Sequence, residues 1–360
     1  MITAVRSVYY GDQDELLRDC LVPLARELSQ RPALRGAWLQ TRWEQGPLVV
    51  LFVDGEPEGA HAAARTVTER VEAFLARRSC TDVRPAAGAA TEPGCGAPGV
   101  AAALPALPAG CPDRGAVVDT FLRGERAQAA MGRIMTAGMT AVDETIDETL
   151  AATPLLDAVL SAMAAVATAH PRLGLAGGRD VLRSHWAAYV RGADDGTLDA
   201  RLERTYAAQR GALVGRLEAA YAGGVAARAA DPALDVWAGW VETALPVALD
   251  LAAAGEVPPC FGAGTDAAAY GFTVHCFFEL LPLLGVAPVQ RYALAALVAR
   301  AAEDVLAGTY LPDAPVTGPQ PGGARAAGAH VAGAQVAGWP VAGPDAAGTP
   351  VPPWWGGLDG

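Results

Sequence analysis

Residues 1–53 decide the fold, and they read MITAVRSVYY GDQDELLRDC LVPLARELSQ RPALRGAWLQ TRWEQGPLVV LFV. The pattern of apolar and polar residues predicts a strand over 3–10, and the leucine spacing from 14 to 28 predicts an amphipathic helix. Residues 37–43 and 48–53 are strand-like and flank a turn at Gly46-Pro47. The order strand, helix, strand, turn, strand predicts the first part of a small β-rich unit.

The next stretch completes this unit and then changes character. Residues 59–78 predict an Ala/Arg-rich amphipathic helix, and 80–85 is a candidate closing strand. Together they make 1–85 a predicted ferredoxin-like β-rich unit. Residues 86–113 are rich in Pro, Gly and Ala, which is typical of a loop.

The remainder, 114–312, is predicted to be mainly helical. Helical patterns occupy 115–170, 179–192, 198–222, 231–254, 265–284 and 288–307. The predicted fold class is therefore α+β, with a small ferredoxin-like N-terminal unit joined to a mostly helical remainder in a single domain over 1–312. Beyond it, a Val-Ala-Gly triplet recurs at 331, 336 and 341 among prolines and glycines, so 313–360 is predicted to be a disordered tail.

Composition excludes several kinds of chemistry. All 27 basic residues are arginine, so no lysine can form the Schiff base of pyridoxal phosphate or serve a P-loop. The formal net charge of −12 argues against general nucleic-acid binding. None of the six cysteines forms a CxxC pair, which argues against zinc and redox dithiols. We see neither a signal peptide nor an uninterrupted apolar run of ~18 residues, so the expected location is the cytoplasm, away from membranes.

A second informative stretch lies near the end of the helical region. It reads Tyr270-Gly271-Phe272-Thr273-Val274-His275-Cys276-Phe277-Phe278-Glu279, and Gly285 and a helix from Pro288 follow. Together with the N-terminal pattern, it resembles the C-terminal elimination domain of class I lanthipeptide dehydratases. In that family a histidine in a similar apolar setting precedes an Asn-Arg-Leu element. Here Glu279 and Leu280 replace the Asn-Arg part.

The chain departs from that family at residues 47–53. Elimination domains resemble Pro-His-x-Arg-x-Arg there, and the arginines help to handle the glutamyl ester that leaves an activated serine or threonine. This chain has Val50 and Phe52 at the two arginine positions. A departing glutamate would lack its paired cations, and burying an unpaired carboxylate is costly. Glutamate elimination then requires another arginine, such as Arg42.

One branch of the same family suits this departure. Thiopeptide pyridine synthases resemble elimination domains but join two dehydroalanines of one peptide. The resemblance implies a formal [4+2] aza-cycloaddition that closes a macrocycle and releases water and the leader peptide, without metal, nucleotide or flavin. A stand-alone lyase or cyclase of ribosomal peptide maturation is therefore the leading hypothesis, acting on a dehydrated precursor peptide with a leader segment. We expect no cofactor, and the oligomeric state, including a homodimer, stays open.

The candidate catalytic residues all belong to the second stretch. His275 is the candidate acid/base, because imidazole titrates near neutrality. Tyr270 is a candidate proton donor, and Glu279, four residues after His275, is a candidate to orient it. Each has a plain structural alternative: His275 as a core histidine, Tyr270 as a packing residue and Glu279 as a charge at a helix end.

The candidate substrate-binding residues are more scattered. Arg42 lies on the predicted strand 37–43, between Thr41 and Trp43, where a surface strand residue is an equal alternative. The others are aromatic residues and a second histidine: Tyr9, Tyr10, His185, Trp186 and Tyr189. Of Tyr9 and Tyr10 only one can face a pocket, because they are adjacent on a strand. The group from His185 to Tyr189 has helical spacing, for which core packing is the alternative.

Two other functions stay open at this point. The chain is alternatively a split dehydratase partner that releases glutamate from glutamylated Ser/Thr. It is also alternatively a non-catalytic peptide-binding scaffold, because the Asn-Arg element and both arginines are missing. A peptide that carries two dehydroalanines separates these hypotheses: only the pyridine synthase forms a pyridine macrocycle and releases the leader.

Overall fold

The computed structural model describes residues 1–8, 13–43, 47–77, 122, 124–146, 155–193 and 197–308. These residues form two compact units, and each is described by itself. Unit 1 holds the described residues up to 147 together with Thr243–Val286, and unit 2 holds those from 155 to 242 and from Ala287 on. The predicted closing strand at 80–85, the predicted loop at 86–113 and the predicted tail at 313–360 lie outside the described residues.

Unit 1 contains the strands, which form one antiparallel sheet of three in the order β1-β3-β2. β2 and β3 are joined by a short connection, and Trp43 pairs with Pro47 at its end, as expected for a hairpin. The strands are β1 (Ile2–Val8), β2 (Leu34–Trp43) and β3 (Pro47–Gly55). The helices that accompany them are α1 (Gln13–Leu16), α2 (Val22–Ser29), α3 (Pro57–Ala76) and α4 (Glu125–Ile146).

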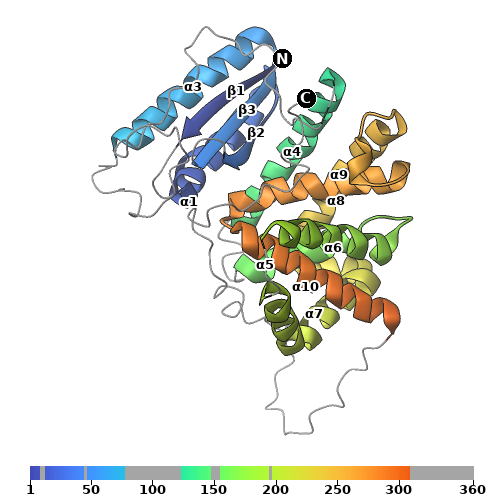
Figure 1. Ribbon diagram of the computed structural model, residues 1–360. Coiled ribbons are helices and arrows are strands. Elements are labelled where there is room, and N and C mark those ends of the chain that lie inside the picture. The colour runs from blue at the N-terminus through green and yellow to red at the C-terminus, as the bar shows by residue number, and fades with distance from the viewer. Residues whose placement is uncertain are drawn as a thin grey trace. The chain divides into compact units, whose positions relative to one another are not determined.

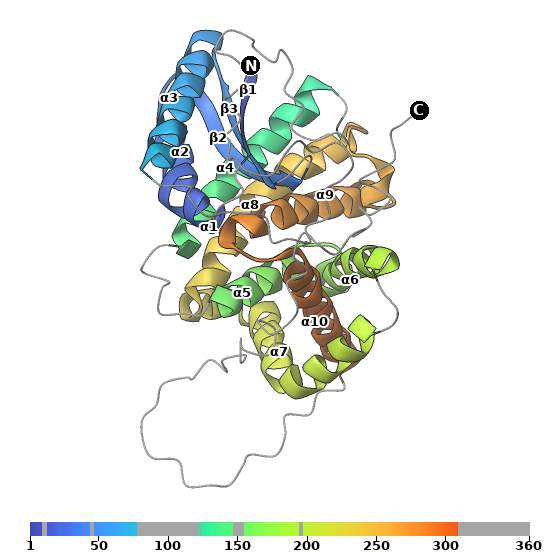
Figure 2. The same cartoon turned by 60° about the vertical axis from the view of Figure 1, so that its left-hand side comes forward.

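The sheet of unit 1 is covered on both faces. Figure 2 shows it between α2 and α3 on one side and α4 on the other. The register pairs Trp38 with Phe52, and both side chains are buried on the face toward α4. Gly132 allows α4 to approach this face, because a Cβ there would lie 2.7 Å from the Trp38 ring. The central strand is buried on both faces, which explains its uninterrupted apolar sequence.

The free edge of β2 is partly closed by α2. The Ser29 hydroxyl donates to the carbonyl of Ala37 at 3.3 Å, and the Ala37 backbone N–H donates back to the same oxygen at 3.2 Å. These bonds satisfy the outward-facing backbone groups of β2 at this residue, where an exposed edge would invite pairing with another chain.

Unit 1 ends in a nearly all-apolar helix. α9 (Thr265–Leu280) is followed by a 3-10 turn at Leu281–Leu284, and both contact β2 and α4. The stretch Thr265–Leu284 is long and apolar enough to cross a membrane by length and composition. However, 83% of its apolar window is buried inside the structure, as in the core helix of a globular unit.

Unit 2 is helical throughout its described part. Its central helix, α10 (Pro288–Ala307), packs against α6 and α7, while α5 contacts all three (Figure 1). The others are α5 (Leu155–Thr168), α6 (Gly174–Ala193), α7 (Thr197–Ala230) and the first part of α8 (Pro232–Ala253), whose second part belongs to unit 1. The prediction of an α+β chain, with a small sheet and a mostly helical remainder, is confirmed. A four-stranded ferredoxin-like arrangement stays a prediction.

Candidate active site

The candidate catalytic residues lie on α9, the most buried helix of unit 1. Nearly every side chain from Ala268 to Leu280 is buried, so the helix has no solvent-facing stripe. The imidazole residue His275 is 4% exposed and Tyr270 is fully buried. Both therefore sit in surroundings where water does not compete for their hydrogen bonds.

A turn that precedes α9 covers His275. Phe261, the last residue of the 3-10 turn Pro259–Phe261, places its ring 5.3 Å from the imidazole ring, centre to centre. The same ring makes an edge contact with Phe272 at 5.6 Å. The candidate acid/base is thus packed under an aromatic side chain that is itself partly exposed.

Gly271 makes this close cover possible. A Cβ at this position would lie 2.0 Å from the carbonyl oxygen of Phe261, which no side chain tolerates. Sequence reasoning missed the pairing of Phe261 with Gly271. The signal was an isolated glycine inside an apolar helical pattern, which indicates close backbone approach when it has a packing reason.

Tyr270 keeps its proton because of burial. Removal from water disfavours the phenolate and raises the pKa of Tyr270 well above its ordinary value. At 100° per residue, Tyr270 points ~140° away from His275 around the helix axis and ~180° away from Glu279. The two candidate proton carriers therefore leave α9 in different directions.

Glu279 lies closer to the expected arrangement. It is four residues after His275, ~40° away around the axis, and its side chain is partly exposed. The helix thus places the carboxylate on the side of the imidazole, as the sequence predicted. A role in orienting His275 stays a prediction.

The two positions where elimination domains carry arginines are parts of the core. Val50 and Phe52 are each 2% exposed on the α4-facing side of the sheet. Phe52 stacks on Trp38 with ring centres 5.3 Å apart and ring planes 8° apart. Across the sheet Val50 pairs with Gln40, which is also buried. Neither position can hold a cation for a departing glutamate.

The arginines near the sheet differ in what they can offer to a substrate. Arg35, on β2, donates to both carboxylate oxygens of Asp54 at 2.6 and 3.0 Å and to Glu56 at 3.3 Å. This network raises the pKa of Arg35 through its hydrogen bond to Asp54 and occupies its donors. Arg42 lies near the end of β2, but the side chain of Arg42 is outside the described part, as are Tyr9 and Tyr10.

The remaining predicted residues lie on α6 of unit 2. Trp186 is 8% exposed and its indole N–H donates to Asp199 at 3.0 Å, which ties α6 to the first turn of α7. His185 is partly exposed, and its Nδ1 lies 3.0 Å from the carbonyl oxygen of Val181. Tyr189 belongs to α6, but its side chain is outside the described part. The hydrogen bond to Asp199 means that Trp186 helps to hold α6 against α7 within unit 2.

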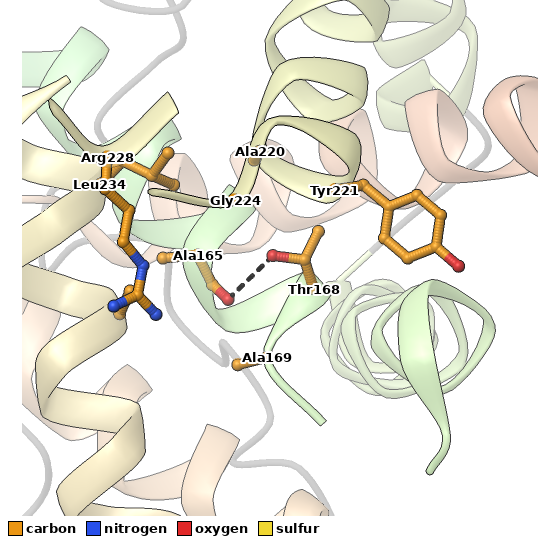
Figure 3. Close-up of a pocket in the computed structure, with 9 residues that line it drawn as sticks. Ala165, Thr168, Ala169, Ala220, Tyr221, Gly224, Arg228 and Leu234 are labelled. Atoms are coloured by element: carbon orange, nitrogen blue, oxygen red, sulfur yellow. Dashed lines mark hydrogen bonds between the residues drawn. The ribbon is translucent and has the colours of Figure 1, made fainter. Parts of the chain in front are cut away.

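Unit 2 also contains a cavity of ≈ 240 Å³ between α5, α7 and α8. Figure 3 shows Tyr221 and Arg228 on opposite sides of a floor made mostly of alanines. Thr168 turns its hydroxyl to the carbonyl of Ala165 at 3.3 Å. None of the residues predicted from the sequence lines this cavity. Among the described side chains, no cluster of three or more His, Cys, Asp or Glu residues is placed to hold a metal ion.

Two solved structures share this fold over most of the chain. One is described as a pyridine synthase, TbtD, from thiomuracin biosynthesis: the TM-score is 0.64 and the identity 22%, over 85% of this chain and 99% of that chain. The other is the crystal structure of TsrL: the TM-score is 0.56 and the identity 16%, over 85% of this chain and 95% of that chain. No family model matches the sequence, and no curated protein matches it. At these identities the likeness establishes a common fold.

Proposed function

We propose that this chain is a cytoplasmic enzyme of thiopeptide maturation, a pyridine synthase that acts on a dehydrated precursor peptide with a leader segment. The observation that carries the proposal is the end-to-end match with TbtD, which spans 99% of that chain and 85% of this one. The fold is therefore shared over most of this chain with a protein that is described as a pyridine synthase.

The proposed reaction is a formal [4+2] aza-cycloaddition. One dehydroalanine and the iminol form of the preceding amide act as a 2-azadiene, and a second dehydroalanine supplies the alkene. Two carbon–carbon bonds form, one between the methylene carbons of the two dehydroalanines and one between the iminol carbon and the α-carbon of the second dehydroalanine, and the ring closes the macrocycle. Loss of the iminol oxygen as water, and then of the leader as its amide, leaves an aromatic pyridine. No oxidant is needed, because both eliminations restore unsaturation.

The site has to supply proximity and proton transfer. Holding two distant peptide segments in contact can contribute ~7–11 kcal/mol toward the barrier. We assign His275 as the acid/base that moves protons at the iminol and the leaving groups, because its imidazole is buried on α9. Tyr270 keeps its proton through burial and is the assigned hydrogen-bond donor, and Glu279 is assigned to orient His275.

The sheet supports cyclisation over glutamate elimination. Releasing glutamate requires cations at the anionic by-product. The positions that would carry them, Val50 and Phe52, are apolar and buried, and Arg35 is engaged by Asp54 and Glu56. Cyclisation releases water and an amide, and neither product requires a guanidinium partner.

The test is incubation of the purified chain with a synthetic peptide that carries a leader and two dehydroalanines. We expect a pyridine macrocycle and a free leader amide by mass spectrometry. His275→Gln, which keeps a polar side chain of similar size, should lose most of the product while retaining the melting temperature. The matched control is His61→Ala on α3. A wild-type yield from His275→Gln would assign the proton transfers to another group, and no product from the unaltered chain would overturn the proposed function.

A further inference from the structure

The segment between α8 and α9 combines features of a cover that can move. It runs from Gly255 to Gly264, and both ends have a positive φ, 72° and 83°, a backbone conformation suited to glycine. Between them only Val257 is buried, while Pro259, Cys260 and Ala263 are exposed. Such a segment has few buried contacts to hold it in place, as is typical of elements that open locally.

Phe261 is the contact by which this segment closes over α9. Its ring touches Phe272 and the imidazole of His275, and its carbonyl lies over Gly271. A second, weaker contact is the ion pair between Glu256 and Arg126 of α4 at 2.8 Å. Both side chains of that pair are partly exposed, at 27% and 59%, so the pair favours the closed segment by a factor of only about two to five.

We infer that residues 256–263 form a lid and that Phe261 is its gate: closed, it shields His275 from water, and open, it admits a reactant to the imidazole. The closed state is the one described by the contacts of Phe261. The inference rests on the proposed function for the identity of the reactant, a dehydrated peptide, while the movement itself concerns only the exposure of His275. Phe261 is accordingly a positioning residue, which keeps the imidazole dry and oriented.

The lid is tested by the reactivity of single histidines toward diethyl pyrocarbonate, measured by mass spectrometry of the peptides. Without any substrate, Phe261→Ala should raise the modification rate of His275 about tenfold. The reason is that the aromatic ring of Phe261, which packs against the imidazole, is removed. Gly271→Ala should do the same, since its methyl group displaces the Phe261 backbone. Gly215→Ala is the matched control, because a Cβ there meets no atom within 4 Å.

His170 provides the internal reference for folding. It is 1% exposed in unit 2, and its Nδ1 accepts the backbone N–H groups of Arg172 and Leu173. If Phe261→Ala raises the rate at His275 but not at His170, and the amides of β3 in unit 1 keep their protection from hydrogen exchange, the lid stands. An unchanged rate at His275 overturns it.

If His170 also becomes reactive, Glu256→Gln decides. This substitution leaves the core intact and removes only the ion pair, so we expect the rate at His275 to rise about two- to fivefold. An unchanged rate in this variant overturns the lid. None of these readouts uses the cyclisation, so failure of the lid is distinguishable from failure of the proposed function.

Discussion

Replacing Phe52 with arginine restores a charge that elimination domains carry, and we expect it to destroy the sheet of unit 1. Phe52 is 2% exposed and stacked on Trp38, 5.3 Å between ring centres, beneath α4 at Gly132. Removing a buried phenylalanine costs ~3–5 kcal/mol, of which the aliphatic stem of arginine recovers a part. The effective penalty for the buried guanidinium adds several kcal/mol. We expect a net loss of about 4 kcal/mol or more, a large share of a typical domain's stability.

The assay for this prediction combines thermal unfolding by circular dichroism with amide hydrogen exchange of residues 47–55. The exchange readout is needed because the two units need not unfold together. Phe52→Leu is the matched control, for which we expect a loss below ~1.5 kcal/mol, since leucine stays apolar. A Phe52→Arg protein with the exchange protection of the wild type would refute the reasoning, and glutamate release from a glutamylated peptide by that variant would reopen elimination.

Three further predictions concern stability. Arg216→Leu should destabilise unit 2 by ~3–5 kcal/mol in urea unfolding, because Asp157, 2% exposed, loses a cation at 3.1 Å; a change below ~1 kcal/mol would contradict it. Asp231→Ala should lower stability by ~1–2 kcal/mol, since it removes the acceptor for Leu234 N–H at 3.1 Å and for Ser161, and an unchanged melting temperature would argue against this cap. Tyr270→Phe should flatten the fall in stability at alkaline pH. The folded pKa of Tyr270 is raised, so the unfolded chain releases this proton first as pH passes the ordinary value of 10, and stability declines above it; an identical pH profile for the variant would oppose this.

Apolar periodicity, together with Pro and Gly at helix ends, predicted most of the helices. Where this prediction missed a detail of a helix, the backbone gives a physical reason. α10 spans Pro288–Ala307 as predicted, because Pro288 stands in its first turn and Gly308, with φ of 60°, ends it. The predicted helix at 14–28 contains a π-helical turn at Leu17–Leu21, where the N–H of Val22 donates to Leu17. Pro23 follows it and has no N–H to continue the regular ladder. Apolar periodicity does not resolve such a one-residue change.

Only the part of the candidate site that lies on a single helix, α9, could be predicted from the sequence. The sequence predicted that His275 lies in an apolar helix and that Glu279 lies on the same side of that helix. Both conclusions need only helical periodicity. It did not reveal Phe261, because the contact between Phe261 and the imidazole depends on the path of a turn fourteen residues earlier in the chain. Nor did it separate burial from function at Trp186, whose partner Asp199 belongs to the next helix.

The most direct test of the central claim is a competition between two substrates. The purified chain receives equal amounts of a glutamylated Ser/Thr peptide and a leader peptide with two dehydroalanines, and mass spectrometry follows both. The account predicts that the second peptide loses water and its leader to form a pyridine macrocycle, while the first stays glutamylated. Release of glutamate from the first peptide, with the second unchanged, would contradict it.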